Sequence, residues 1–374
     1  MSLLLPLVLC VLATDTGAMI LFEETSKPFT LVPQGCNDSH VLDFADFALG
    51  LINRDQQDGY ILNLNRVKEA WQYRQDTQNF TGSLFYFTLD VLETYCHALS
   101  QKIFWNECYL RDRHESVYGQ CKIMFYVSKP ERILHVLAYN CTLRPVSRRQ
   151  IHMICPDCPS PTNLSDPNVL EAATESLAKF NRESPSKQYS LVKVTRASSQ
   201  WVFGPGYFVE YLVEESPCNK SQADSCPLQP SNSVPVGLCK GSLSRRETEK
   251  FISVACDFFS PQALDYAASQ RAAKEARENE TASINPESNI IPGLIQRLPD
   301  LDDEKCEDSK GKPSQGFSVE LDLTTNPEGE VLDISYLFDK TPKKLLVLPF
   351  PKGEEYSDEC PGPARDDSPL VLTP

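Results

Sequence analysis

The segment MICPDCPSP, residues 153–161, holds two cysteines three positions apart, with one carboxylate, Asp157, between them. This spacing occurs in zinc knuckles, in redox pairs and in small structural clips. A zinc knuckle needs four ligands, and no second C-x-x-C or histidine pair accompanies Cys155 and Cys158. Prolines at 156, 159 and 161 do not suit the helix start of a thioredoxin-like redox pair. A stiff structural clip, or a clip that presents Asp157 to a partner, therefore remains.

Other catalytic patterns are missing from the sequence. It contains no G-x-S-x-G elbow, no H-E-x-x-H, no phosphate-binding glycine loop and no dinucleotide fingerprint. Its five histidines are too scattered for a three-histidine metal site. His152 lies near Cys155, but a cysteine with a disulfide partner has no thiolate for nucleophilic attack. We therefore predict a protein that is not an enzyme and has no cofactor or metal of its own.

The cysteine chemistry depends on the compartment. An apolar run from Leu3 to Ala13, followed by small residues, is typical of a cleaved signal peptide over 1–18. The chain should then be secreted and extracellular, with its remaining cysteines in disulfides and one left over. A net charge of −15 argues against nucleic acid, no other run is long enough for a membrane span, and a calcium partner is only weakly indicated. Glycosylation sequons stand at Asn37, Asn79, Asn140, Asn163, Asn219 and Asn279, of which Asn140 is the weakest because cysteine follows it.

An internal repeat organises the chain. The spacings C-x11-C-x12-C-x19-C (from Cys96) and C-x7-C-x12-C-x16-C (from Cys218) share their central element, and G-x-C-K recurs at each third cysteine. An amphipathic helix is predicted upstream of each set, from Val41 and from Val169. Their apolar faces are expected to be Leu42, Ala45, Leu49, Ile52 and Leu170, Ala173, Leu177, Phe180, with Asp166 and Pro167 starting the second helix.

Alternating aromatic and β-branched residues after each helix predict about four antiparallel strands. The fold class is therefore α+β, with two tandem units in which a sheet wraps one helix. We place the first unit at 28–144, a linker with the clip at 145–166, the second unit at 167–259 and a largely irregular C-terminal region at 260–374.

The repeated unit resembles the cystatin domain, and two units followed by an irregular region resemble the fetuin branch of the cystatin superfamily. The resemblance is carried by CPDCP (155–159), SLFYFTLDVLETYC (83–96), ATESLAKFN (173–181) and VLPFPK (347–352). It implies six disulfides and leaves Cys306 unpaired. These are Cys36–Cys360, Cys96–Cys108, Cys121–Cys141, Cys155–Cys158, Cys218–Cys226 and Cys239–Cys256.

Cystatins that inhibit papain-type proteases insert an N-terminal glycine, a Gln-x-Val-x-Gly hairpin and a Pro-Trp hairpin. The second unit has only the hairpin sequence QWVFG, which places Gln200, Trp201, Val202, Phe203, Gly204 and Pro205 at a candidate inhibitory tip. Trp201 either packs on its own sheet or anchors an interface. With one element of three, papain-type inhibition is expected to be residual at most.

The resemblance implies inhibition of astacin-family zinc endopeptidases, with ovastacin as the physiological target and egg-coat hardening as the process prevented. The clip of Cys155, Pro156, Cys158 and Pro159 loses little entropy on entering a cleft. A carboxylate is a good zinc ligand, so Asp157 is expected to bind the open position of the target's zinc. Residues 245–249 are expected to add contacts. The alternative is a carrier of calcium phosphate, for which Arg66, Lys68 and Glu69 give the first unit a mixed rather than an acidic strand face.

Overall fold

The computed structural model describes residues 31–77, 80–100, 108–185, 187–216, 234–247, 249–279, 292–300, 302, 317, 319–338, 342–352 and 357–372. The expected signal peptide at 1–18 lies outside these ranges. Within them, no helix combines the length and apolar character that a membrane span requires.

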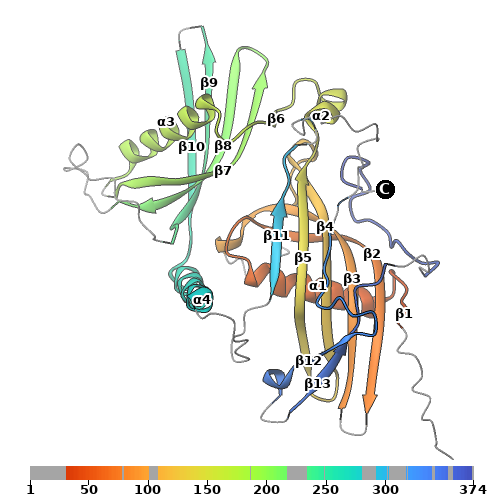
Figure 1. Cartoon of the computed structure of the whole chain (residues 1–374). Coiled ribbons are helices and arrows are strands. Elements are labelled where there is room, and N and C mark those ends of the chain that lie inside the picture. Colours follow the sequence, from red (N-terminus) through yellow and green to blue (C-terminus); the bar gives the residue numbers. More distant parts are fainter. Residues whose placement is uncertain are drawn as a thin grey trace, which may run out of the picture. The chain divides into compact units, whose positions relative to one another are not determined.

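The first unit is one helix packed on a sheet. Helix α1 (Ser39–Asp55) lies across strands β2 (Tyr60–Thr77), β3 (Phe80–His97), β4 (Val117–Ser128) and β5 (Ile133–Pro145) (Figure 1). The sheet order is β1-β2-β3-β4-β5-β11, with β1 (Val32–Pro33) antiparallel at one edge and β11 (Gly293–Arg297) parallel at the other. Short 3-10 turns, η1 (Ala98–Ser100) and η3 (Arg113–Glu115), follow β3 and precede β4.

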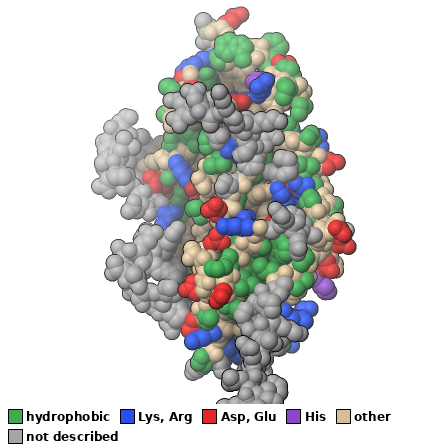
Figure 2. Space-filling model, turned by 45° about the vertical axis from the view of Figure 1, so that its right-hand side comes forward, with side chains coloured by type: hydrophobic (Ala, Val, Ile, Leu, Met, Phe, Trp, Pro, Cys, Tyr) green, Lys and Arg blue, Asp and Glu red, His purple; other side chains and the backbone are tan. Residues whose placement is uncertain are grey.

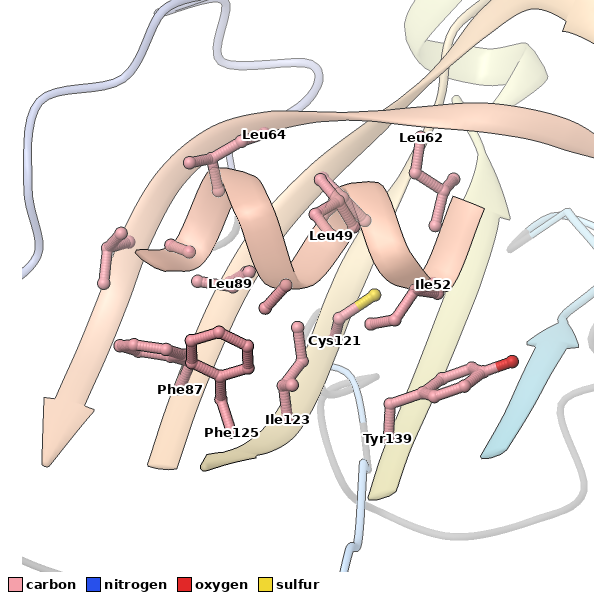
Figure 3. Close-up of a cluster of buried hydrophobic side chains, with 14 of the residues drawn as sticks. Leu49, Ile52, Leu62, Leu64, Phe87, Leu89, Cys121, Ile123, Phe125 and Tyr139 are labelled. Atoms are coloured by element: carbon pink, nitrogen blue, oxygen red, sulfur yellow. The ribbon is translucent and has the colours of Figure 1, made fainter. Parts of the chain in front are cut away.

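Helix α1 is stabilised by its N-cap and by the apolar core that it forms with the sheet. Asp38 caps α1 by accepting a hydrogen bond from the amide of His40 at 2.7 Å. Leu49 and Ile52 point from α1 onto Phe87 and Ile123 of the strands (Figure 3). Burying these apolar side chains provides the main favourable free energy of this unit.

The second unit repeats the arrangement, so the predicted α+β class with two cystatin-like units is confirmed. Helix α3 (Pro167–Glu183) packs on a sheet of order β10-β9-β8-β7-β6. The strands are β6 (Ser160–Pro161), β7 (Tyr189–Trp201), β8 (Pro205–Glu215), β9 (Gly237–Arg246) and β10 (Glu249–Phe258).

Helix α3 begins as predicted, with Asp166 as N-cap and Pro167 in the first turn, but one predicted core residue is wrong. Leu170 is 44% exposed, because the buried stripe consists of Val169, Ala173 and Leu177 with Ala172 and Ser176 beside it. Its small residues let the helix lie close to the sheet, and Leu170 falls outside that stripe.

In its described residues the C-terminal region is largely irregular, as predicted, and it packs on the first unit. It contains α4 (Pro261–Asn279), β11, and a hairpin of β12 (Glu330–Asp333) and β13 (Lys344–Val347), with the 3-10 turn η5 (Ser335–Leu337) between them. Leu345 and Val347 are buried against Tyr86 and Tyr126 of the first sheet. The hydroxyl of Tyr86 donates to the carbonyl of Leu348 at 2.9 Å, and the Cys36–Cys360 disulfide closes the region onto the start of α1.

A cluster of charged side chains and one tyrosine joins the two sheets. We use the name charge cluster for Tyr60, Glu93, Arg111, Arg196, Glu210 and Arg297. In β8, the carboxylate of Glu210 is 2.9 Å from Arg111 Nη2 and accepts a hydrogen bond from the hydroxyl of Tyr60 in β2. In β3, Glu93 binds Arg196 of β7 at 2.5 Å and Arg297 of β11 at 2.8 Å. Because each buried carboxylate is paired with guanidinium groups, the cluster leaves neither carboxylate as an unpaired buried charge.

Glu210 gives this junction a dependence on pH. Burial by itself raises the pKa of Glu210, but the charge and hydrogen bonds of Arg111 outweigh it and lower the pKa to about 2. A carboxyl group with a depressed folded-state pKa stabilises the fold fully above its unfolded value of about 4.5, and this contribution is lost as the pH falls towards 2.

We therefore expect the free energy of unfolding of Glu210→Gln to fall below that of the parent protein at pH 7. By linkage, the difference should shrink by roughly 2–3 kcal/mol between pH 7 and pH 2.5, because Glu210 of the unfolded chain takes up a proton below about pH 4.5 while the folded carboxylate stays largely ionised. Denaturant unfolding of both proteins across this range measures it. A difference that does not change with pH would contradict the assignment of Glu210.

Candidate functional site

The clip, residues 155–158, is a closed turn at the end of a helix. Helix α2 (Arg148–Ile154) ends at Cys155, and the amide of Cys158 donates to the carbonyl of Cys155 at 3.1 Å. The Cys155–Cys158 disulfide closes the same four residues covalently. Pro156 and Asp157 are exposed at the apex, and no described residue donates a hydrogen bond or forms an ion pair with the Asp157 carboxylate. The carboxylate is therefore presented to solvent on a rigid turn.

Both ends of the clip are fixed. Before it, Ile151 of α2 is buried in an apolar cluster with Leu92 and Tyr118 of the first unit. After it, Ser160 and Pro161 form β6, which pairs with Ser199 and Ser198 of β7. The linker therefore has little freedom, because its flanks belong to two different packed units.

The tip, residues 201–205, joins β7 to β8. Trp201 is 76% exposed and Phe203 is 78% exposed, so Trp201 does not pack on its own sheet. Gly204 has a φ of +119°, and a Cβ atom there would clash with the carbonyl oxygen of Arg245. Glycine is therefore required where this hairpin turns.

Strand register relates the tip to the clip. Ser160 lies opposite Ser199, two residues before Trp201, while Trp201 pairs with Pro205 across the hairpin. The clip precedes Ser160 by two residues, so the turn and the tip leave the same end of the second sheet. The structure thus brings Asp157, from the linker, and Trp201, from β7, to the same end of the sheet.

Only part of the neighbouring β9–β10 turn is free to contact a partner protein. The guanidinium group of Arg245 is bound to Glu171 and approaches Asn168 in α3, so Arg245 ties the hairpin to its own helix. Arg246 and Glu247 are exposed, with the Arg246 guanidinium 5.8 Å from the ring of Phe203, and Thr248 lies outside the described residues. Of the expected contact residues in this turn, Arg246, Glu247 and Glu249 are exposed and remain candidates.

Helix α2 was not predicted from the sequence. A capping-box pattern, Ser147-x-x-Gln150, stands at its start and could have signalled it. The helix exposes Met153 (71%) and Ile154 (65%) immediately before the clip. Two exposed apolar side chains therefore precede Asp157 by three and four residues.

A cavity of about 880 Å³ lies between the sheets, beside the charge cluster. Glu93 and Glu210 line it, and both carboxylates are held by guanidinium groups. Neither carboxylate is available as a general acid or base. Among the described residues, no group of three or more histidine, cysteine or acidic side chains could hold a metal ion.

Five of the six expected disulfides are present with the expected pairing, and Cys218–Cys226 and Cys306 lie outside the described residues. Among the sequons, Asn37 and Asn163 are exposed. The side-chain amide of Asn140 donates to the carbonyl of Glu320 at 2.6 Å. Asn79, Asn219 and the side chain of Asn279 are not described, and the occupancy of all six stays a prediction.

Comparisons with known proteins agree with this architecture. A family model described as Cystatin domain matches residues 157–246. Fetuin-B of Homo sapiens is 56% identical over 388 aligned residues, covering 100% of both chains. The solved structure of mouse fetuin-B in complex with crayfish astacin superposes with a TM-score of 0.73 at 49% identity, covering 92% of this chain and 98% of that one. The inhibitory complex of human meprin beta with mouse fetuin-B gives a TM-score of 0.72 at 52% identity, covering 91% and 99%.

The glycine at the tip provides a test of its geometry. Gly204→Ala should lower the free energy of unfolding by roughly 1–3 kcal/mol, since alanine is strained at this φ and clashes with backbone. Gly206→Ala is the matched control, because a Cβ there meets only ordinary contacts at 3.8 Å or more. Thermal unfolding compares the two, and equal losses would show that the tip does not require glycine.

Proposed function

Since the chain belongs to the fetuin-B family, we propose that it inhibits astacin-family zinc metalloendopeptidases by inserting the clip and the tip into the protease cleft. It is an inhibitor and not an enzyme. The observation that carries the proposal is the exposed carboxylate of Asp157 on a disulfide-closed turn, at the same end of the second sheet as the exposed aromatic side chains of the tip.

Asp157 has the chemistry for the central step. A catalytic zinc keeps one coordination position open for water or substrate, and a carboxylate oxygen can bind there. Asp157 would displace the nucleophilic water, while the closed turn offers no peptide bond aligned for attack. The metal belongs to the target protease, and this chain supplies only the ligand.

The tip would supply most of the buried area. Trp201 and Phe203 are large, have few rotatable bonds and are already exposed, so their burial in a cleft releases water at little conformational cost. The clip and the tip together would then grip the cleft from two sides.

A finer proposal concerns the physiological setting. We propose that the chain is secreted, which its disulfides support because they need an oxidising compartment. We further propose ovastacin as the target, so that the inhibitor prevents premature hardening of the egg coat. The family resemblance, rather than the geometry, supports this choice.

A mineral carrier is less well supported. A carrier would need a dense array of free carboxylates, yet Arg66 is bound to Asp90 at 2.5 Å and Glu69 accepts from Thr88 on the strand face in question. The C-terminal hairpin covers another part of that sheet. On the face shown in Figure 2, acidic and basic side chains are interspersed rather than gathered into one acidic patch.

Substitution of Asp157 tests the metal bond. Asp157→Ala should raise the inhibition constant for an astacin-type protease about 1000-fold, equivalent to the loss of about 4 kcal/mol. Trp201→Ala should raise it only about 30-fold, equivalent to about 2 kcal/mol. Asp157→Asn, which keeps the shape but lacks the charge, should behave like the alanine variant.

Glu328→Ala is the matched control, because it removes an exposed carboxylate from a distant turn. Inhibition constants that are the same for Asp157→Ala and the parent protein would falsify the zinc-ligand role. Circular dichroism of each variant confirms that the fold is kept.

A panel of proteases tests the target class. The full chain should inhibit astacin-type proteases, ovastacin included, and should leave papain unaffected, because two of the three cystatin contact elements are missing. Steady-state assays with each enzyme measure this. Stronger inhibition of papain than of any astacin-type protease would contradict the proposed target class.

A further inference from the structure

Helix α2 cannot position the clip by itself. It has seven residues, and an isolated helix of this length is marginal in water. One apolar residue, Ile151, is buried, while Met153 and Ile154 face solvent. The orientation of the clip must therefore be fixed by what packs around α2.

The C-terminal region caps the start of α2. The carboxylate of Asp302 accepts hydrogen bonds from the Ser147 hydroxyl and the Arg149 amide, both at 2.9 Å. Asp300 accepts from the amide of Arg148 at 3.1 Å and lies 3.4 Å from its guanidinium nitrogen Nε. These bonds satisfy first-turn amide groups that a helix leaves unpaired, and negative charge is favourable there.

The end of the chain packs beneath α2. Leu370 and Val371 are buried in the same apolar cluster as Ile151 and Val146, and Cys158 of the clip packs against this cluster. The apolar support of α2 and of the clip thus includes the last described residues of the chain.

This end is held firmly along β2. Asp366 and Asn65 exchange two hydrogen bonds, at 2.8 and 3.1 Å, and Arg365 binds Asp46 of α1 at 2.7 Å. The amide of Gly362 donates to the carbonyl of Val67, two residues after the disulfide to Cys36. The segment from Cys360 to Val371 therefore runs from one fixed point to the clip.

We infer that the C-terminal region is a brace that sets the position of the clip, with Asp300, Asp302, Leu370 and Val371 as positioning residues for inhibition. The effect on inhibition rests on the proposed function. Without the brace, Asp157 would still be present, but its carboxylate would be held less accurately in the position that binds the target's zinc. Cleavage that removed residues 368–372 would then weaken the inhibitor while leaving both sheets intact.

The test compares two double variants of the full chain. L370A/V371A removes the brace beneath the clip, and L345A/V347A removes equally buried side chains from the C-terminal hairpin. The first should raise the inhibition constant for an astacin-type protease roughly 10- to 100-fold, mainly through faster dissociation, since a misplaced ligand loses this much. The second should lower the melting temperature but leave the inhibition constant unchanged. L370I/V371I should restore inhibition.

Two further readouts separate this inference from the proposed function. Amide hydrogen exchange across residues 148–158 should quicken in L370A/V371A and not in L345A/V347A, whether or not the protein inhibits any protease. In an Asp157→Ala background, the brace variant should have no additional effect on inhibition. Unchanged exchange at the clip, or equal losses of inhibition in the two double variants, would overturn the inference. Failure of the parent protein to inhibit would instead refute the proposed function.

Discussion

The pairing of the buried Glu210 carboxylate with Tyr60 and Arg111 is the interaction on which the relative placement of the two sheets depends. Glu210 lies in β8 of the second sheet, and its partners Tyr60 and Arg111 come from the first unit. A buried carboxylate without these partners would cost several kcal/mol, so the sheets meet only in a register that supplies them. That register decides where the linker must pass, and hence where a turn built into the linker can point.

Much of the fold was predictable because it is encoded locally. Three- and four-residue periodicity identified both principal helices, alternation identified the strands, and the repeated cysteine spacing revealed two related units. The error at Leu170 has a physical origin. Helix α3 packs on its sheet through the small residues Ala172, Ala173 and Ser176. A search for regularly spaced large apolar residues does not identify such small residues as the buried face, so it selected Leu170 instead.

The site was predictable to a different degree. Asp157 and the tip stood out because cysteine, proline and glycine constrain the backbone, and their exposure agrees with that interpretation. Arg245 was expected at the contact surface, but it pairs with Glu171 on its own helix. The support of α2 could not be found from the sequence, since Asp302 and Ser147 are 155 residues apart and no local pattern links them.

The disulfide between Cys36 and Cys360 has a consequence for biosynthesis. Its two cysteines are separated by 324 positions, so it cannot form until nearly the whole polypeptide has been translated. The two sheets can fold during synthesis, whereas the segment that reaches the clip is fastened last. A nascent or prematurely terminated chain would thus contain both folded units and an intact Cys155–Cys158 turn, yet lack the element that aims it. Competence as an inhibitor would then be acquired only at the final stage of maturation.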